Sequence, residues 1–472
     1  MRGMTGAVLW SLVTVVVLIR VPSLMAQEVR EAEPPAYRKL RYEEEYTYLR
    51  DPRQRGDVFD PLKYIPLAPN GAIYLSLGGE IRARYEYTHN PAWGQDAQDD
   101  YGVFLQRYSL HGDLHLTSSV RIFAQLLSAL ADGRAGGASP VDKDALDLQQ
   151  AFLDLRLPVG GNGALTLRAG RQEMAFGSGR LVDVREGPNV RRTFDGGRVL
   201  LQTPAWRVEG FVTRPAEDER GVFDDGSDTT QALWGVYSVG TLPILAPGSL
   251  DLYYLGFQDD QAVYDQGTGA ESRHSLGVRL WGQPGAWDYN GEFVYQWGEF
   301  GAGEIQAWTV AVVTGYTWTT VPLRPRVGVS TNIASGDRDP TARDLQTFNP
   351  LFPRGSYFSE TALLGPRNFF NIQPSLTLTP LADVSVTVDV NWFWRLQTAD
   401  GVYSPSGQLL RPAGGSTARF VGSNLAVKAE WHMQRHVTLT TIYEHFFPGA
   451  FLRETGPHAA IDFIELTLLF RF

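Results

Sequence analysis

Cysteine is absent from this chain of 472 residues, so no disulfide can form. The absence is compatible with a chain that crosses an oxidising periplasm without needing disulfides. Long apolar runs are also missing. After residue 26 no segment approaches the roughly eighteen apolar residues of a membrane helix, which excludes spanning helices. The sequence shows no cluster of metal ligands and no phosphate-binding loop, and we expect no cofactor. What is abundant suits strands and turns, because aromatic residues make up 12% of the chain and glycine accounts for 49 residues.

The N-terminus has the features of an export signal. Arg2 gives a positive start, and the apolar run from Ala7 to Ile19 is shorter than a comfortable membrane span. Ala26 offers a small residue at a plausible cleavage point. Residues 1–26 are therefore predicted to be a removed signal peptide, with an uncleaved anchor as the alternative. Residues 27–72 are charged and tyrosine-rich without alternation, and they are predicted to form a periplasmic lead-in.

Strict alternation of apolar and polar residues marks both ends of the remaining chain. The last segment, 461–472, places leucine and phenylalanine on one parity and Glu465, Thr467 and Arg471 on the other. The segment 73–87 does the same, with two arginines and two glutamates on its polar face. Charges on a strand face are costly in a dry core but can line water. The apolar parity is thus predicted to face lipid and the polar parity a channel.

The same pattern recurs along the whole chain, with connections that alternate between short and long. Tight turns and long external loops are the rule for bacterial membrane barrels, and a soluble sandwich does not predict them. The fold is therefore predicted to be all-β: a transmembrane antiparallel β-barrel of about 18 strands over residues 73–472, with short periplasmic turns and long extracellular loops. The predicted strands are 73–87, 102–116, 119–129, 146–157, 164–174, 197–203, 206–214, 231–239, 249–258, 273–283, 287–299, 304–318, 324–335, 366–379, 383–396, 419–432, 436–446 and 461–472.

The segment from Arg168 to Arg198 carries the densest charge, with seven arginines, several acids and bend-forming glycines. One interpretation is a solvated external loop whose charges pair with one another. The other is a loop turned inward that forms a basic constriction, because arginines pair bidentately with carboxylates and would draw polyanions. Arg171 falls on the apolar parity of its strand, which implies a bulge at Gly170 or a position at the rim.

Several of these stretches together resemble the alginate export family. They are Lys63 to Leu67 (KYIPL), Leu75 to Glu80 (LSLGGE) with Arg82, Arg84 and Glu86, Leu167 to Glu173 (LRAGRQE), Phe176 to Ser178 (FGS), Arg180 to Val182 (RLV), Arg185 to Gly196 (REGPNVRRTFDG), Thr347 to Pro353 (TFNPLFP) and Tyr443 to Pro448 (YEHFFP). The resemblance covers nearly all of the predicted mature chain. It implies an eighteen-stranded outer-membrane channel with an arginine-rich constriction, through which an acidic uronate polysaccharide leaves the cell.

On the matching positions, six arginines are predicted to line the pore and five acids to hold them in place. Each of these residues could instead form an ordinary salt bridge of the barrel wall. The predicted pore-lining residues are Arg82, Arg84, Arg107, Arg168, Arg171 and Arg192. The predicted charge partners are Glu80, Glu86, Asp183, Glu186 and Asp195.

The leading functional hypothesis is a non-enzymatic channel for anionic saccharides in the bacterial outer membrane, and the alternative is a general or anion-selective porin for the uptake of small solutes. A hydrolase is disfavoured, because His111, His115 and His445 have no serine, asparagine or acid in a recognisable motif near them. The predicted partners are outer-membrane lipid, an anionic polysaccharide or small anion, the barrel assembly machinery through the strand that ends at Phe472, and periplasmic export proteins. No nucleic-acid partner is expected.

Overall fold

The computed structural model describes residues 35–69, 71–241 and 247–472. The predicted signal peptide, residues 1–26, lies outside the described residues. The chain divides into two units, Met1–Ala36 and Tyr37–Phe472, and the second contains all the strands described below. Among the described residues, no helix has the length and apolar character needed to cross a membrane.

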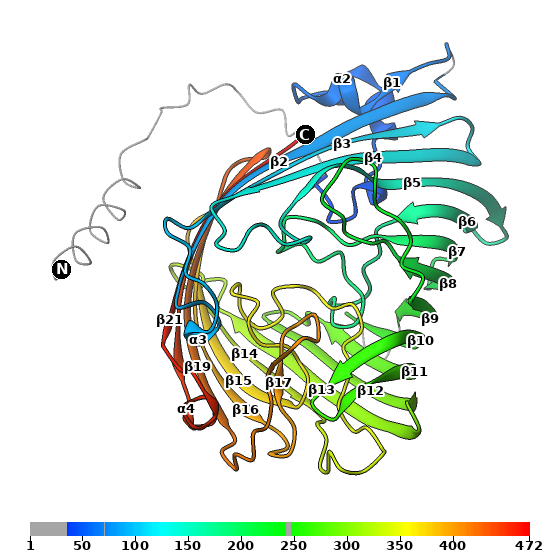
Figure 1. Ribbon diagram of the computed structural model, residues 1–472. Coiled ribbons are helices and arrows are strands. Elements are labelled where there is room, and N and C mark those ends of the chain that lie inside the picture. The colour runs from blue at the N-terminus through cyan, green and yellow to red at the C-terminus, as the bar shows by residue number, and fades with distance from the viewer. Residues whose placement is uncertain (1–34, 70, 242–246) are drawn as a thin grey trace. The chain divides into compact units, whose positions relative to one another are not determined.

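The unit Tyr37–Phe472 is a closed antiparallel β-barrel (Figure 1). Its main sheet has 19 strands in the described residues. One of these, β1 (Ile65–Pro66), only extends the pairing of β2, and the other eighteen form the wall. The wall strands are β2 (Tyr74–His89), β3 (Val103–His115), β4 (Val120–Asp132), β5 (Asp144–Val159), β6 (Gly163–Gln172), β7 (Phe194–Gln202), β8 (Trp206–Pro215), β9 (Gln231–Thr241), β10 (Gly248–Tyr264), β11 (Gly267–Gly282), β12 (Trp287–Phe300), β13 (Gly303–Thr317), β14 (Arg326–Ala334), β15 (Phe369–Leu381), β16 (Val384–Arg395), β19 (Phe420–Gln434), β20 (Val437–Pro448) and β21 (Ile461–Arg471).

The remaining elements are short and lie before or between the wall strands. The 3-10 helices are η1 (Arg41–Glu43), η2 (Thr47–Arg50) and η3 (Pro52–Gln54). The α-helices are α2 (Asp60–Lys63), α3 (Pro91–Gly94) and α4 (Ala450–Thr455), and a separate hairpin consists of β17 (Val402–Tyr403) and β18 (Leu409–Arg411).

The first and last wall strands close the barrel. β2 pairs with β21 in a register that places Glu80 opposite Arg471 and Tyr85 opposite Leu466. Arg471 Nε donates to Glu80 Oε2 at 2.8 Å, which adds an ion pair to the backbone ladder on the inner side of this seam. The predicted all-β barrel of about eighteen strands is therefore confirmed.

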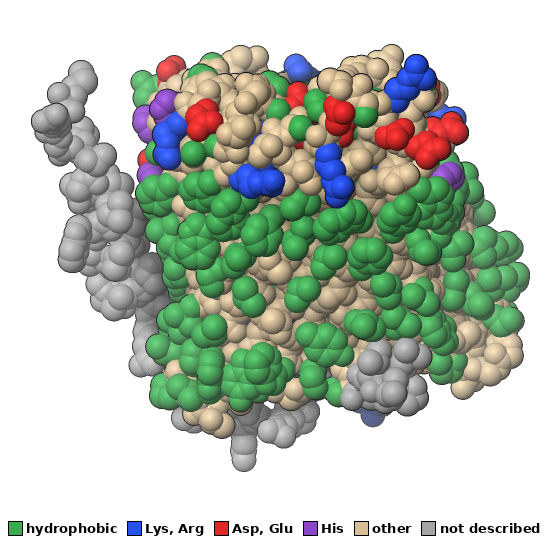
Figure 2. Space-filling model, turned by 90° about the horizontal axis from the view of Figure 1, so that it is seen from below, with side chains coloured by type: hydrophobic (Ala, Val, Ile, Leu, Met, Phe, Trp, Pro, Cys, Tyr) green, Lys and Arg blue, Asp and Glu red, His purple; other side chains and the backbone are tan. Residues whose placement is uncertain are grey.

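The alternation seen in the sequence separates an outer from an inner face. On β2, Ile81 and Tyr85 are exposed, whereas the neighbouring Glu80 and Arg82 are buried. Hydrophobic side chains form a belt on the visible outer wall, and charged side chains gather at one rim (Figure 2). Such a broad apolar surface is suited to lipid. Leu466 and Leu468 belong to the exposed apolar face, as predicted.

The predicted lipid contact of Phe470 and Phe472 needs a correction. Both rings are only half-buried rather than exposed, because Phe59 of the N-terminal segment packs on them with ring centroids 5.8 and 5.2 Å away. The aromatic end of the last strand therefore contacts protein at the short-turn end of the barrel.

One predicted long loop is mostly strand. The residues 259–272 continue β10 and β11, and the turn between the two strands contains only Asp265 and Gln266. A register shift between Asp259 and Ala262 interrupts the pairing. Tyr264, at the end of the extended β10, is buried, and its hydroxyl donates to Glu271 at 2.6 Å.

Candidate functional site in the barrel interior

The connection between β6 and β7, residues 173–193, runs through the barrel interior. Met174 and Val184 have no exposed surface, and Val182 and Val190 are 1% exposed. Its backbone pairs with a second inward segment, since Asp183 N donates to Phe352 O at 2.9 Å and Phe352 N donates to Leu181 O at 2.9 Å. Of the two interpretations of this charged stretch, the structure shows the inward loop. We call residues 173–193 the inward loop.

Arg82 on β2 holds one end of the inward loop through backbone oxygens. Its guanidinium donates to the carbonyls of Glu186, Gly187 and Pro188 at 2.9–3.1 Å. It also donates to Asn189 Oδ1 at 3.1 Å. The next inward residue, Arg84, donates to Gly187 O at 2.8 Å and to Glu86 Oε1 at 3.2 Å. Planar guanidinium groups with several fixed donors are suited to this clustered contact.

A charge network lies beneath the same end of the loop. Arg107 on β3 contacts Glu80 and Glu186 at 2.6 Å each. Arg191 contacts Glu186 as well, and it also pairs with Glu173 at 2.7 Å. Burial alone would raise the pKa of Glu186, but the guanidinium groups of Arg191 and Arg107 outweigh it and lower that pKa to about 2. Glu186 therefore stays ionised over the ordinary pH range and ties the loop to the wall.

The loop reaches the opposite wall through Arg180. Its Nε lies 3.1 Å from Glu292 on β12, and its Nη1 donates to Asn332 Oδ1 on β14 at 2.6 Å. Together with Arg82 and Arg107, this contact means that the inward loop spans the barrel from β2–β3 to β12–β14.

Two of the predicted pore-lining residues belong to separate wall contacts. Arg168 forms a bidentate pair with Asp154 at 2.7 and 2.8 Å, and its guanidinium lies between the rings of Phe152 and Tyr42. Arg171 pairs with Asp195 at 2.8 Å. The pairing of β6 with β5 and β7 continues without a shift, so there is no bulge at Gly170, and Arg171 lies near the end of β6 at the rim.

The last predicted site residues lie within the inward loop itself. Arg192 lies 5.1 Å from the centre of the Phe352 ring and donates to Pro353 O at 3.4 Å. Burial and the nearby Arg185 lower the pKa of Arg192 to about 9. The structure thus brings Arg82, Arg84, Arg107, Glu80, Glu86 and Glu186 together, and places Arg168, Arg171, Arg192 and Asp195 in other contacts. Asp183 pairs with Lys39 and lines one cavity with Arg82, Arg84 and Glu186.

Part of the predicted periplasmic lead-in also lies inside the barrel. Tyr42 OH donates to Glu173 O at 2.9 Å, and Arg121 of β4 donates to Tyr42 O at 2.7 Å. Arg191 donates to Lys39 O at 2.9 Å, so this segment and the inward loop hold each other. Residues 27–72 carry no strand or helix pattern, so their sequence did not predict this ordered contact.

A cavity of about 280 Å³ lies between the inward loop, the segment 354–360 and the strands β19–β21. Basic residues outnumber acidic ones six to four in its lining. Arg354 is exposed in it and has no carboxylate within ion-pair distance among the residues that the structure describes. The charged lining residues are Lys39, Arg82, Arg84, Arg354, Lys428, Arg471, Asp183, Glu186, Glu360 and Glu465.

Sequence reasoning missed Lys39, Arg354 and Glu360 as residues of this cavity. Arg354 directly follows the stretch TFNPLFP that carried part of the family resemblance, so extending that stretch by one residue would have found it. Lys428 was detectable from its parity on β19. The other two lie on segments without periodicity, and no signal in the sequence points to them.

Solved outer-membrane proteins share this architecture. The outer membrane protein OpdK from Pseudomonas aeruginosa is 11% identical, with a TM-score of 0.57 over 84% of this chain and 98% of that chain. A BenF-like porin from Pseudomonas fluorescens Pf-5 is 12% identical, with a TM-score of 0.57 over 84% and 98%. OccD3 (OpdP) from Pseudomonas aeruginosa is 14% identical, with a TM-score of 0.56 over 84% and 91%. At such identities the likeness concerns the fold alone.

No curated protein matches the chain. The sequence model for alginate export matches residues 73–464, which include every wall strand except the end of β21. With that match over most of its length, the chain belongs to the alginate export family.

Proposed function

We propose that this barrel, an outer-membrane channel by family and fold, passes anionic saccharides and exports an acidic, alginate-like polysaccharide. The observation that carries the proposal is the cavity beside the inward loop, where basic residues outnumber acidic ones. Carboxylates of a uronate chain are suited to guanidinium and ammonium groups that keep free donors. Passage needs no catalytic group, and the fold and family are those of channels.

Two cations of the cavity are more available than the arginines that hold the loop. Arg354 donates to the Tyr357 carbonyl at 3.0 Å and has no acid partner in the described chain. Lys428 lies 3.6 Å from Glu360, and its side chain is 41% exposed. These groups are the proposed contacts of a passing carboxylate.

Planar-bilayer conductance tests this proposal. The wild-type barrel should give an anion-selective current, and polyuronate should block it. Arg354→Glu should lower the anion-to-cation permeability ratio by about fivefold or more, since a unit charge contributes ~1 kcal/mol at 4 Å in water. Arg324→Glu is the matched control, because this exposed residue in the turn after β13 carries the same charge away from the cavity. Cation selectivity of the wild type would overturn the proposal.

Uptake of small anionic solutes is the second candidate, and the size of the cavity favours it. About 280 Å³ is near the lower end of the roughly 300–1,000 Å³ of small-ligand pockets and is small for a polymer. One of the solved relatives in fold, OpdK, was determined with vanillate. Liposome swelling separates the two functions: rapid entry of a monomeric uronate without block by polyuronate supports uptake, whereas block by the polymer supports export.

A further inference from the structure

A cluster of aspartates lies where the connection between β8 and β9 meets the start of β5, at the long-loop end of the barrel. Three backbone hydrogen bonds hold the two segments side by side. Ala145 N donates to Arg220 O at 3.3 Å, Leu146 N donates to Gly221 O at 3.2 Å, and Phe223 N donates to Leu146 O at 2.9 Å. This pairing fixes the position of the carboxylates that follow residue 223.

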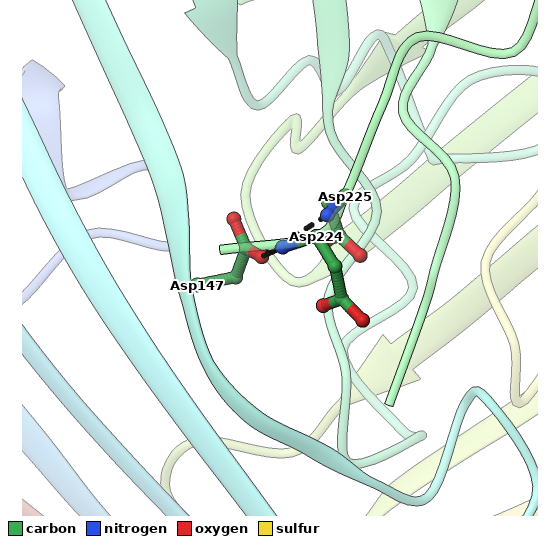
Figure 3. Close-up of side chains that lie close together, drawn as sticks. All are labelled: Asp147, Asp224 and Asp225. Carbon is green, nitrogen blue, oxygen red and sulfur yellow. Dashed lines mark hydrogen bonds between the residues drawn. The ribbon is translucent and has the colours of Figure 1, made fainter. Parts of the chain in front are cut away.

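Asp147, Asp224 and Asp225 converge at this junction (Figure 3). One oxygen from each carboxylate lies within 4.8 Å of the others. Asp147 Oδ2 accepts hydrogen bonds from the backbone N–H groups of Asp224 and Asp225 at 3.0 and 3.2 Å, as the dashed lines in Figure 3 show. Glycine at 221 makes room for the loop, since a Cβ there would lie 2.2 Å from Asp224 Oδ2. Backbone hydrogen bonds therefore hold the three aspartates close to one another.

A fourth aspartate, Asp144, gives an independent indication that this place binds a cation. Asp144 has no exposed surface, and neither of its carboxylate oxygens has a hydrogen-bond partner among the described residues. The carboxylates of Asp225, Asp147 and Asp224 lie close enough to act on its charge, so Asp144 lies beside the cluster. A buried carboxylate without donors is costly unless a cation or a proton compensates it.

The two nearby arginines pair most closely with other aspartates. Arg171 pairs with Asp195 at 2.8 Å and reaches Asp147 only at 3.8 Å. Arg185 pairs with Asp218 at 2.6 Å.

We propose that Asp147, Asp224 and Asp225, with Asp144 behind them, bind a divalent cation of the Ca²⁺ type. All the side-chain donors are carboxylate oxygens, which suit hard cations rather than zinc or copper. Ca²⁺ tolerates an irregular set of six to eight oxygen ligands better than Mg²⁺, which requires a near-octahedral arrangement. The bound cation fastens the connection 216–230 to β5. Arg171 supports the same connection by donating to Asp225 O at 3.1 Å.

Limited proteolysis of the full-length barrel in detergent tests this site, because Arg220 is exposed in the fastened connection. Ca²⁺ should slow tryptic cleavage after Arg220, and at ten times the dissociation constant the open population should fall about tenfold. A chelator should restore cleavage. Asp224→Asn and Asp144→Asn should each abolish the protection. Asp96→Asn, which changes an exposed aspartate of another loop, should retain it.

Using Asp224→Asn beside Asp144→Asn separates loss of the cation from a folding defect. Asp144 is buried, whereas Asp224 is exposed, so Asp224→Asn leaves the packing of the wall intact. Absence of protection in the wild type at about 10 mM Ca²⁺, above the weakest affinities of about 1 mM for such sites, would overturn the proposal. Equal protection by NaCl at matched ionic strength, or protection that survives both variants, would also overturn it.

Discussion

The cations of the β2–β3 wall and those on the other side of the cavity carry the same charge but have different partners. Arg82 gives its donors to the loop backbone, and Arg107 lies between two glutamates at 2.6 Å. Arg354 contacts only the carbonyl and the ring of Tyr357 among the described side-chain partners, and Lys428 contacts one glutamate at 3.6 Å. The difference shows that an arginine-rich interior has two tasks. Fully paired arginines hold the inward loop, and only the incompletely paired cations remain for a solute.

Removing a holding arginine should have the largest effect. Arg107→Ala removes the cation that lies 2.6 Å from both Glu80 and Glu186, and breaking a buried ion pair costs about 3–5 kcal/mol. We expect a lower free energy of unfolding in urea and a noisy, enlarged bilayer conductance, because the inward loop loses an anchor. Arg107→Lys should recover part of both properties. Unchanged stability and conductance in Arg107→Ala would remove the distinction between the two groups of cations.

Acid should release the same anchor without mutation. The pKa of Glu186 is lowered from 4.5 to about 2 in the folded protein, so its stabilising contribution is complete above pH 4.5 and is lost as the pH falls toward 2. Conductance should therefore stay constant from pH 8 to 5 and rise in more acidic buffer. Glu186→Gln should remove most of this acid-dependent rise. A transition centred near pH 7 would contradict the assignment to Glu186.

A substitution in the N-terminal segment, which helps to hold the inward loop, should lower the free energy of unfolding by a smaller amount. Tyr42→Phe removes the hydroxyl that donates to Glu173 O and accepts from Arg198 at 3.2 Å, while the ring against Arg168 stays. One or two lost hydrogen bonds should cost about 1–2 kcal/mol in the free energy of unfolding. Tyr108→Phe, on an exposed tyrosine of β3, provides the control. Equal losses in the two variants would show that Tyr42 has no special part in holding the segment.

The smallest effect on stability is expected for an available cation. Lys428→Gln should change the free energy of unfolding by less than about 0.5 kcal/mol, because its pair with Glu360 is long and half-exposed. The reversal potential of the Lys428→Gln channel should nevertheless shift in the direction of lower anion selectivity, by less than that of Arg354→Glu. A variant that is destabilised but keeps its selectivity would place Lys428 among the holding residues.

The fold was predictable because each wall strand repeats one simple rule. Side chains alternate between lipid and interior, and this period is visible in segments such as 73–87 and 461–472. The charge pairs of the site were harder to predict from the sequence. Arg107 and Glu186 are far apart in sequence, and their contact depends on the path of an irregular loop. The same limit explains why Arg354 and Lys39 were missed, since neither lies on an alternating strand.

Glu80 belongs at once to the seam and to the support of the inward loop. It accepts hydrogen bonds from Arg107 on β3 and from Arg471 on β21. During assembly, a barrel whose last strand has not docked leaves this carboxylate short of one of its two cations. Docking of β21 therefore completes the charge balance beneath the loop, and a seated loop in turn favours docking of β21, because such coupling is reciprocal. Closure of the wall between β2 and β21 and seating of the inward loop thus become one cooperative step. This coupling disfavours a closed barrel whose inward loop is not seated.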